Sequence, residues 1–345
     1  MGFLRCKMIF CQCLLLIIKQ HKGVINMNNL RKIGLSALAG SLATFSVNAA
    51  DMSVSGSAAI TFSDANREFG SNGNGFTMGD SLNFSASGDL DNGMSITLAH
   101  EIDGGALDDY SITLSGDFGT LAFDGHGASS ALGAVDDVTP NAYEEAWDII
   151  DTNGTTAGGT PTVINGSGAD NAFIYTSPNV GGASFKVYYV NHTSDAAESY
   201  LDFAVDIQPE MVEGLRLGFA SADHTIAAAS SREQEETTMY ATYAMGGFTV
   251  GVQSSDLDDT TANSDQESVA YGLTYAVNDD LTIGYNYHEV EFEQSTLSDQ
   301  ESTTIGASFT SGSMTIGGAM NESDNMGGAA ATDREGYEFS VSFAF

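Results

Sequence analysis

The densest group of side chains able to act on charged molecules is an acidic stretch between residues 126 and 170. It contains no Lys or Arg, and its carboxylates are Asp136, Asp137, Glu144, Glu145, Asp148, Asp151 and Asp170. Carboxylates crowded into a narrow, low-dielectric passage attract cations and repel anions. On an open surface the same run would be only a solvated face, and carboxylates occur throughout this chain. The importance of the stretch therefore depends on where the fold places it.

A short helix is expected inside this stretch. Thr139 suits an N-cap and Pro140 the first helical position, so the helix should run to about Ile150. Its two faces would differ, because residues three or four apart share a side of a helix. The acidic face would carry Glu144, Asp148 and Asp151, and the apolar face would carry Tyr143, Trp147 and Ile150.

No pattern in the sequence indicates catalysis. The His residues after position 50 are isolated, without the spacing of a metal-binding pair, and no nucleophile elbow is present. We therefore expect neither an enzyme nor a resident metal or cofactor. The isolated residues are His100, His126, His192, His224 and His288.

Charge divides the chain into two parts. The chain has 46 Asp and Glu against 11 Lys and Arg. The first fifty residues hold six of the bases and all three Cys but none of the acids, which leaves five bases and every carboxylate after Ala50. Such a chain is unsuited to nucleic acid, whose binding requires neutralised phosphates. Without Cys, the second part also has no disulfide or thiol chemistry.

The first part has the features of an export signal. Met27 to Lys32 is basic, Ile33 to Val47 is apolar or small, and Val47 to Ala49 suits cleavage. We predict a signal peptide over 27–50 and a domain over 51–345. Residues 1–26 are interpreted as an over-called upstream extension, the alternative being a long bipartite leader. Both apolar runs are shorter than the ~20 residues of a membrane-spanning helix.

Apolar and polar residues alternate with period two after Asp51, which is typical of β-strands with two different faces. The first strand shows it with Met52, Val54 and Ile60 between serines and threonines. Sixteen such segments are predicted, at 52–62, 82–86, 94–98, 110–114, 121–123, 173–175, 185–189, 201–207, 215–219, 239–243, 248–252, 269–275, 281–287, 305–309, 314–318 and 337–345.

The links between these segments also alternate. Tight, turn-forming links follow even-numbered strands, at 91–93, 117–119, 245–247, 278–280 and 311–313. Longer links follow most odd-numbered strands, at 63–79, 126–170, 192–199, 223–236, 255–266, 290–301 and 321–334, with 103–109 short. This pattern and the even count predict an all-β, transmembrane antiparallel β-barrel of about 16 strands. An antiparallel sandwich also alternates, but it would need a linker, and its outer face would carry more Lys and Glu.

Strand alternation assigns side chains to the inside or the outside of the barrel. Lys186 and Arg216 lie between outward apolar neighbours and should point into the lumen. The same parity makes Glu101, Asp124, Asp202 and Asp206 lumen acids. Aromatic residues near strand ends should form girdles at the membrane interfaces, namely Tyr188, Tyr189, Tyr243, Tyr285, Tyr287, Phe343 and Phe345.

Three segments carry a family resemblance: the terminal strand Tyr337 to Phe345, the segment Phe173 to Gly182 with its Ser177-Pro178, and the start Ala50 to Gly56. Together they resemble Gram-negative general porins of the alphaproteobacterial type. The resemblance spans about 51–345. It implies a homotrimer in the outer membrane that passes small hydrophilic solutes and ions, with its third loop, here 126–170, folded into the pore. It also implies that Phe345 is the assembly signal for the barrel-assembly machinery.

The sequence departs from this family in its charges. General porins face their acidic loop with a wall of bases, whereas residues after 50 offer only Arg67, Lys186, Arg216, Arg232 and Arg334, and Ile174 stands where Arg is common. We therefore expect a pore that prefers cations. A substrate-specific channel and a secreted acidic adhesin remain alternatives.

Outer-loop carboxylates could in addition bind Ca²⁺ or bridge it to lipopolysaccharide, although none has EF-hand spacing. These carboxylates are Asp256, Asp258 and Asp259, or Glu233, Glu235 and Glu236.

Overall fold

The computed structural model describes residues 51–65, 75–146, 163–164, 166–191, 199–227 and 232–345. The expected upstream extension and signal peptide, together with Arg67, Trp147, Asp148, Ile150 and Asp151, lie outside these residues. Within the described residues, no helix is both long and apolar enough to cross a membrane.

The described chain is built from antiparallel strands. They are β1 (Asp51–Ala65), β2 (Phe76–Asp89), β3 (Ser95–Asp103), β4 (Ala106–Gly116), β5 (Gly119–His126), β6 (Ala172–Thr176), β7 (Ala183–Val190), β8 (Tyr200–Ile207), β9 (Leu215–Ala227), β10 (Arg232–Met245), β11 (Phe248–Asp259), β12 (Gln266–Ala276), β13 (Leu281–Phe292), β14 (Gln300–Ser311), β15 (Met314–Asp324) and β16 (Arg334–Ala344). Two single-turn 3₁₀ helices, η1 (Gly133–Val135) and η3 (Met326–Gly328), lie in links.

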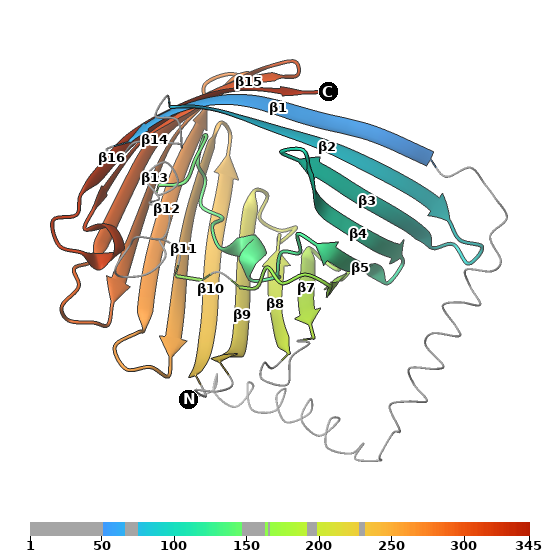
Figure 1. The fold of residues 1–345 in the computed structure, drawn as a ribbon, viewed down its shortest axis with the longest axis horizontal. Coiled ribbons are helices and arrows are strands. Elements are labelled where there is room, and N and C mark those ends of the chain that lie inside the picture. The colour runs from blue at the N-terminus through green and yellow to red at the C-terminus, as the bar shows by residue number, and fades with distance from the viewer. Residues whose placement is uncertain (1–50, 66–74, 147–162, 165, 192–198, 228–231) are drawn as a thin grey trace, which may run out of the picture. The chain divides into compact units, whose positions relative to one another are not determined.

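These sixteen strands of the described chain close into one barrel (Figure 1). Each strand pairs with its sequence neighbours, and β1 closes the ring by pairing with β16, so that Ile60 lies opposite Met78 on one side and Val341 on the other. Closure leaves no unpaired sheet edge. The predicted fold class is thus confirmed, and each predicted strand lies on an observed one.

Several strands are longer than the alternation predicted. β9 continues as far as Ala227, and β10 already begins at Arg232. Much of the link expected over 223–236 is therefore strand. Glu235 and Glu236 suggested a loop, yet both pair with β9 and β11. Glu236 is tolerated there because it points inward, where it is buried and accepts a hydrogen bond from the Gly166 N–H. Glu235 takes the opposite face near a strand end, where a charge costs little.

Alternation separates the two faces of the wall as predicted. On β12, the inward Ser268 and Ala270 are buried, whereas the outward Val269 and Tyr271 are 43% and 45% exposed. One girdle assignment is wrong: Tyr188 points inward and is fully buried, because its neighbour Tyr189 takes the outward position.

Inside the barrel, an apolar core forms between the wall and the link from β5 to β6. We call this link, residues 127–171, the inner loop. Leu132, Val163 and Ile164 of the inner loop pack with wall residues that include Tyr188 and Ala220. Figure 1 shows the described part of the inner loop in green, crossing the inside of the barrel.

The predicted helix is not formed over residues 140–146, which make bends instead. Backbone groups of this segment bond to side chains of the barrel wall, as Glu145 O does with Asn321 Nδ2 at 2.8 Å. A local cap signal cannot include such distant partners. The rest of the expected helix, 147–150, lies outside the described residues.

Candidate functional site: an acidic loop seated inside the barrel

The inner loop is first anchored on β8 by a buried carboxylate. Asp202 accepts hydrogen bonds from the N–H groups of Ala131 and Leu132, each at 3.0 Å, and from the Tyr200 hydroxyl at 3.0 Å. Its exposed fraction is 0%. Asp202 therefore points inward as predicted, but it is covered by the loop and does not face the water path. Its charge is used to hold the backbone.

A second anchor follows on β11 and β13. Gln253 Nε2 donates to the carbonyls of Val135 and Asp136 at 2.7 and 3.1 Å, and its Oε1 accepts from the Val138 N–H at 2.9 Å. Asn286 Nδ2 then donates to Thr139 Oγ1 at 2.6 Å. The side-chain amide of Gln253 can bond both carbonyls and an N–H group of the loop because an amide both donates and accepts hydrogen bonds.

The loop next reaches β15 and β16, on the far side of the wall from β8. Tyr143 donates its hydroxyl proton to Glu338 Oε1 at 2.6 Å, and Asn321 bonds the Glu145 carbonyl. On the returning part, the Gly166 N–H donates to Glu236 Oε2 of β10 at 3.0 Å. The described loop is thus tied to the wall at successive points from β8 to β16.

A row of inward glycines makes room for the loop. We call Gly251, Gly272, Gly284, Gly306 and Gly317 the glycine track. Gly251 lies directly opposite Gly272, and Gly284 opposite Gly306. A Cβ on Gly272 would lie 2.2 Å from the Pro140 carbonyl oxygen. Only glycine permits so close an approach of backbone to wall.

The described loop places four of the predicted acidic residues on the inside of the barrel. Asp136 is exposed, and Asp137, Glu144 and Glu145 are partly exposed. Asp137 Oδ1 accepts from the Thr139 N–H at 2.8 Å and from its hydroxyl at 2.7 Å. Burial nevertheless raises the pKa of Asp137 to about 6, and it also raises the pKa of Asp136.

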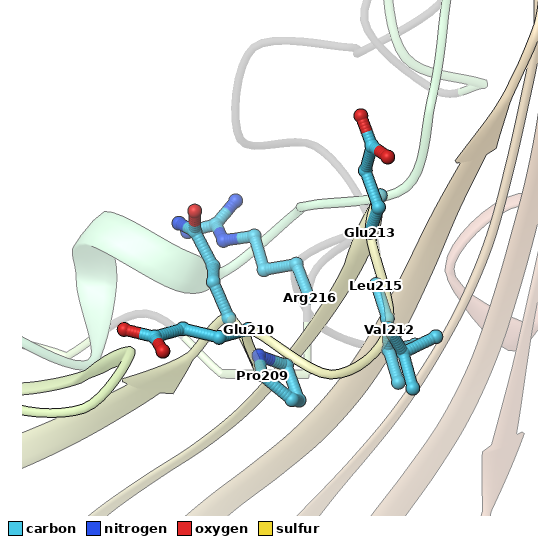
Figure 2. A pocket seen from close by; sticks show the side chains of 8 residues that line it. Pro209, Glu210, Val212, Glu213, Leu215 and Arg216 are labelled. Carbon is cyan, nitrogen blue, oxygen red and sulfur yellow. The ribbon is translucent and has the colours of Figure 1, made fainter.

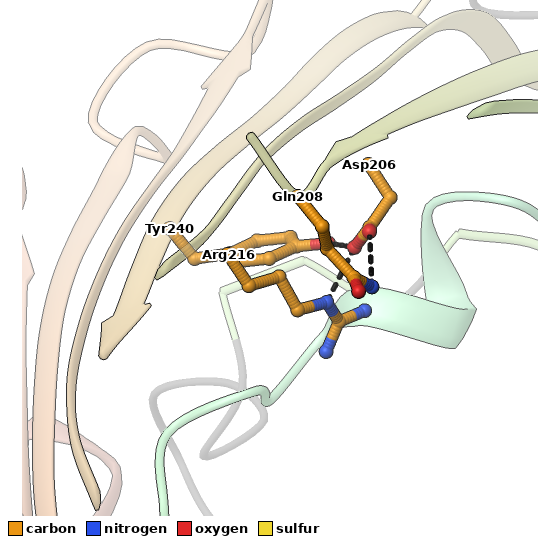
Figure 3. A network of polar contacts seen from close by, with 4 residues as sticks. All are labelled: Asp206, Gln208, Arg216 and Tyr240. Carbon is orange, nitrogen blue, oxygen red and sulfur yellow. Dashed lines mark hydrogen bonds and ion pairs between the residues drawn. The ribbon is translucent and has the colours of Figure 1, made fainter. Parts of the chain in front are cut away.

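The two predicted lumen bases lie among carboxylates and inner-loop atoms. Arg216 Nε bonds Asp206, and its guanidinium lies 5.1 Å from the centre of the Tyr240 ring (Figure 3). Asp206 also accepts from the Tyr240 hydroxyl at 2.8 Å and from Gln208 Nε2 at 3.1 Å. Lys186 Nζ lies 3.5 Å from the Ser129 carbonyl oxygen and interacts electrostatically with Asp202 and Asp124.

The remaining predicted lumen acid, Glu101, lies on β3, two strands before β5 in the ring. It accepts hydrogen bonds from Ser81 Oγ and from Asn83 Nδ2, the latter at 3.3 Å. It is partly exposed. The structure thus brings Asp124, Asp202, Asp206, Lys186 and Arg216 together on β5 to β9, and leaves Glu101 on β3 apart from them.

One end of the barrel carries further carboxylates. The turn between β8 and β9 forms a depression lined by residues 208–210 and 212–216, which include Glu210, Glu213 and Arg216 (Figure 2). This is the end of the short turns, where the chain runs from even- to odd-numbered strands.

The anchoring residues Gln253, Asn286, Asn321 and Glu338 were missed as site residues. Each has inward strand parity, and Asn321 and Glu338 interrupt rows of otherwise small inner residues, whereas Asn286 lies beside the inward His288. That signal is weak, because a polar inner face is expected of any such barrel.

A closed antiparallel barrel with an internal loop defines a class of outer-membrane channels. A family model for Gram-negative porins matches residues 34–308. The chain belongs to the Gram-negative porin family, as the resemblance of its motifs predicted. It is accordingly a channel protein of the bacterial outer membrane, and members of this family act as channels rather than as enzymes.

Solved porin structures have the same fold. An anion-selective porin from Comamonas acidovorans matches with a TM-score of 0.64 and 16% identity, covering 86% of this chain and 100% of that one. OmpT of Vibrio cholerae without its loop L8 matches with a TM-score of 0.62 and 13% identity over the same shares. OmpT in a trimer form gives the same score, identity and coverage. Curated protein sequences give no match.

Proposed function

We propose that this protein is a water-filled pore for passive diffusion of small hydrophilic solutes and ions, and that it prefers cations. The observation that carries the preference is the seating of Asp136, Asp137, Glu144 and Glu145 inside the barrel. Carboxylates at a narrow, poorly hydrated place raise the local cation concentration and oppose anions.

The charge balance near the inner loop supports this preference. Arg216 is paired with Asp206, and Lys186 interacts with Asp124 and Asp202, so neither base offers an unopposed positive charge. Carboxylates on the outer loops contribute less, because charges are screened beyond a Debye length of ~8 Å at physiological salt. The loop carboxylates should therefore set the sign of the selectivity. Asp148 and Asp151 are included in this proposal from the sequence alone.

The assembly and surroundings follow the family. We infer a homotrimer, the form in which OmpT of Vibrio cholerae has been solved, in contact with outer-membrane lipid and lipopolysaccharide. Phe345 would be read by the barrel-assembly machinery during insertion. Ca²⁺ at the carboxylates expected in outer loops, which the structure places at the ends of β10 and β11, belongs to the same proposal. The anion selectivity named for the Comamonas porin is a property of that protein, whose identity to this chain is 16%.

The proposal is tested with purified protein in planar bilayers under a KCl gradient. The zero-current potential should have the sign of K⁺ preference, and Cl⁻ preference would refute the charge argument. The swelling rate of liposomes that contain the protein should decrease smoothly with increasing size of the solute. Uptake that saturates for one solute class would instead favour a substrate-specific channel.

A further inference from the structure

Three potential metal ligands meet at the base of the inner loop. One carboxylate oxygen from each of Asp108 and Asp109 on β4, and one imidazole nitrogen of His126 at the end of β5, all lie within 4.8 Å of one another. No spacing in the sequence joins these residues, because they come together only through the pairing of β4 with β5. An imidazole within the group distinguishes it from a patch of acids alone.

The convergence of the two carboxylates is unusual for a strand. Successive side chains of a regular strand point to opposite faces, so Asp108 and Asp109 should diverge. Here the pairing of β3 with β4 shifts between His100 and Ile102, so that Asp108 and Asp109 both lie opposite the single residue Glu101, and such a β-bulge re-aims nearby side chains. Gly127 then leaves room for the carboxylate, since a Cβ at this position would lie 1.5 Å from Asp109 Oδ1.

The imidazole is held in place by an aromatic stack. The ring of His126 stacks on Tyr110 at 6.4 Å between centroids, and Tyr110 stacks on His100 at 5.8 Å. A further carboxylate lies nearby, with Asp170 Oδ2 at 3.9 Å from His126 Nε2. The ion pairs found among the described residues give Asp108 and Asp109 no Lys or Arg partner.

We propose that Asp108, Asp109 and His126 bind a divalent first-row transition-metal ion such as Zn²⁺, with Asp170 completing the ligand set. Imidazole suits Zn²⁺, Ni²⁺ and Cu²⁺, whereas Ca²⁺ and Mg²⁺ take oxygen ligands. His126 precedes the inner loop and Asp170 lies at its end. A bound ion therefore ties both ends of the loop to the β3–β4 hairpin, which holds the loop base fixed in the barrel.

The test uses the purified, folded protein in detergent, freed of metal by EDTA and titrated with ZnCl₂ in a calorimeter. We expect one saturable site per chain. His126→Ala and Asp109→Asn should each weaken binding by roughly 10- to 100-fold. Asp103→Asn removes an exposed carboxylate of the same hairpin outside the cluster, and it should leave the affinity unchanged.

Absence of saturable binding in the unaltered protein, or equal affinity in all three variants, would overturn the proposal. A second measurement covers the case in which a variant fails to fold. X-ray absorption of the zinc-loaded, unaltered protein should give one imidazole nitrogen among oxygen ligands. A zinc ion bound only by oxygen, or by two imidazoles, would contradict the proposed ligand set.

Discussion

Asp137 is an inner-loop carboxylate whose charge should respond to pH near neutrality. Burial raises its pKa to about 6, against hydrogen bonds from Thr139 that favour the ionised form. Below this pH the carboxyl takes up a proton and the loop loses negative charge. Acidification should therefore weaken the preference of the pore for cations.

Zero-current potentials measured from pH 7.5 to pH 5 should fall in a step centred near pH 6. The Asp137→Asn variant should lack this step and retain a lower, flatter preference. An unchanged step in the variant would assign the titration to another group.

The face of the strand on which a side chain lies was predictable from the sequence, but its solvent exposure was not. Strand alternation placed Lys186 and Arg216 correctly, because neighbouring side chains of a strand must take opposite faces. Asp202 obeys the same rule, yet it is buried, since the inner loop covers it. Burial by a segment 70 residues away in sequence leaves no local signal.

At the scale of elements, the seating of the inner loop depends on the glycine track. Gly272→Ala would place a methyl group 2.2 Å from the Pro140 carbonyl oxygen, so backbone has to move. We expect the barrel to lose about 1–3 kcal/mol of unfolding free energy, as overpacked sites do, and its single-channel current to become noisier. Gly88→Ala on β2 meets nothing within 4 Å and serves as the control. Equal behaviour of the two variants would contradict close seating.

A disulfide can report the same contact directly. A Cβ on Gly306 would lie 3.5 Å from the Tyr143 Cβ, within the usual range for a disulfide. The chain has no Cys after position 50. Tyr143→Cys with Gly306→Cys should therefore cross-link on mild oxidation of the folded protein, as shown by thiol titration and peptide mapping. The pair Tyr143→Cys with Gly88→Cys should remain reduced, and the opposite result would place the loop elsewhere.

The strands were largely predictable, whereas the local conformation of the inner loop was not. Each strand alternates in its own sequence, so the pattern alone marks it. The Thr139-Pro140 signal suggested a helix, but the segment that follows bonds to Asn321 and Glu338, which lie on strands near the end of the chain. Distant partners override a local cap because they bond polar groups of the segment without a helix, as Asn321 does for the Glu145 carbonyl and Glu338 for the Tyr143 hydroxyl.

For the whole molecule, Phe345 extends the seam at which β16 pairs with β1 and closes the barrel. Phe345 exchanges two backbone hydrogen bonds with Gly56 of β1, at 2.8 and 2.9 Å, and its side chain is 69% exposed. Phe345→Asp should leave export intact but reduce the heat-modifiable, membrane-inserted form seen on gels, because a charge replaces an outward apolar group at the closing seam. Phe118→Asp in the β4–β5 turn is the control, and equal assembly of both variants would remove the special role of Phe345.

Ion selectivity belongs to the whole molecule, because the loop carboxylates act only within a closed wall. Two variants that each lose the same number of carboxylate charges can separate the contribution of the inner loop to selectivity from that of the outer loops. One neutralises Asp136, Asp137, Glu144 and Glu145. The other, called the outer-loop variant, neutralises exposed carboxylates of the outer loops and of the strand ends that adjoin them, namely Asp258, Glu291, Glu293 and Asp299. Each replaces Asp by Asn and Glu by Gln.

The most direct measurement is the K⁺ to Cl⁻ permeability ratio of these two variants and of the unaltered protein, obtained from zero-current potentials in a planar bilayer. We predict a ratio above one for the unaltered protein, a fall of about twofold or more in the loop variant, equivalent to ~0.4 kcal/mol, and little change in the outer-loop variant. Cl⁻ preference in the unaltered protein, or an unchanged ratio in the loop variant, would contradict the inner loop as the source of selectivity.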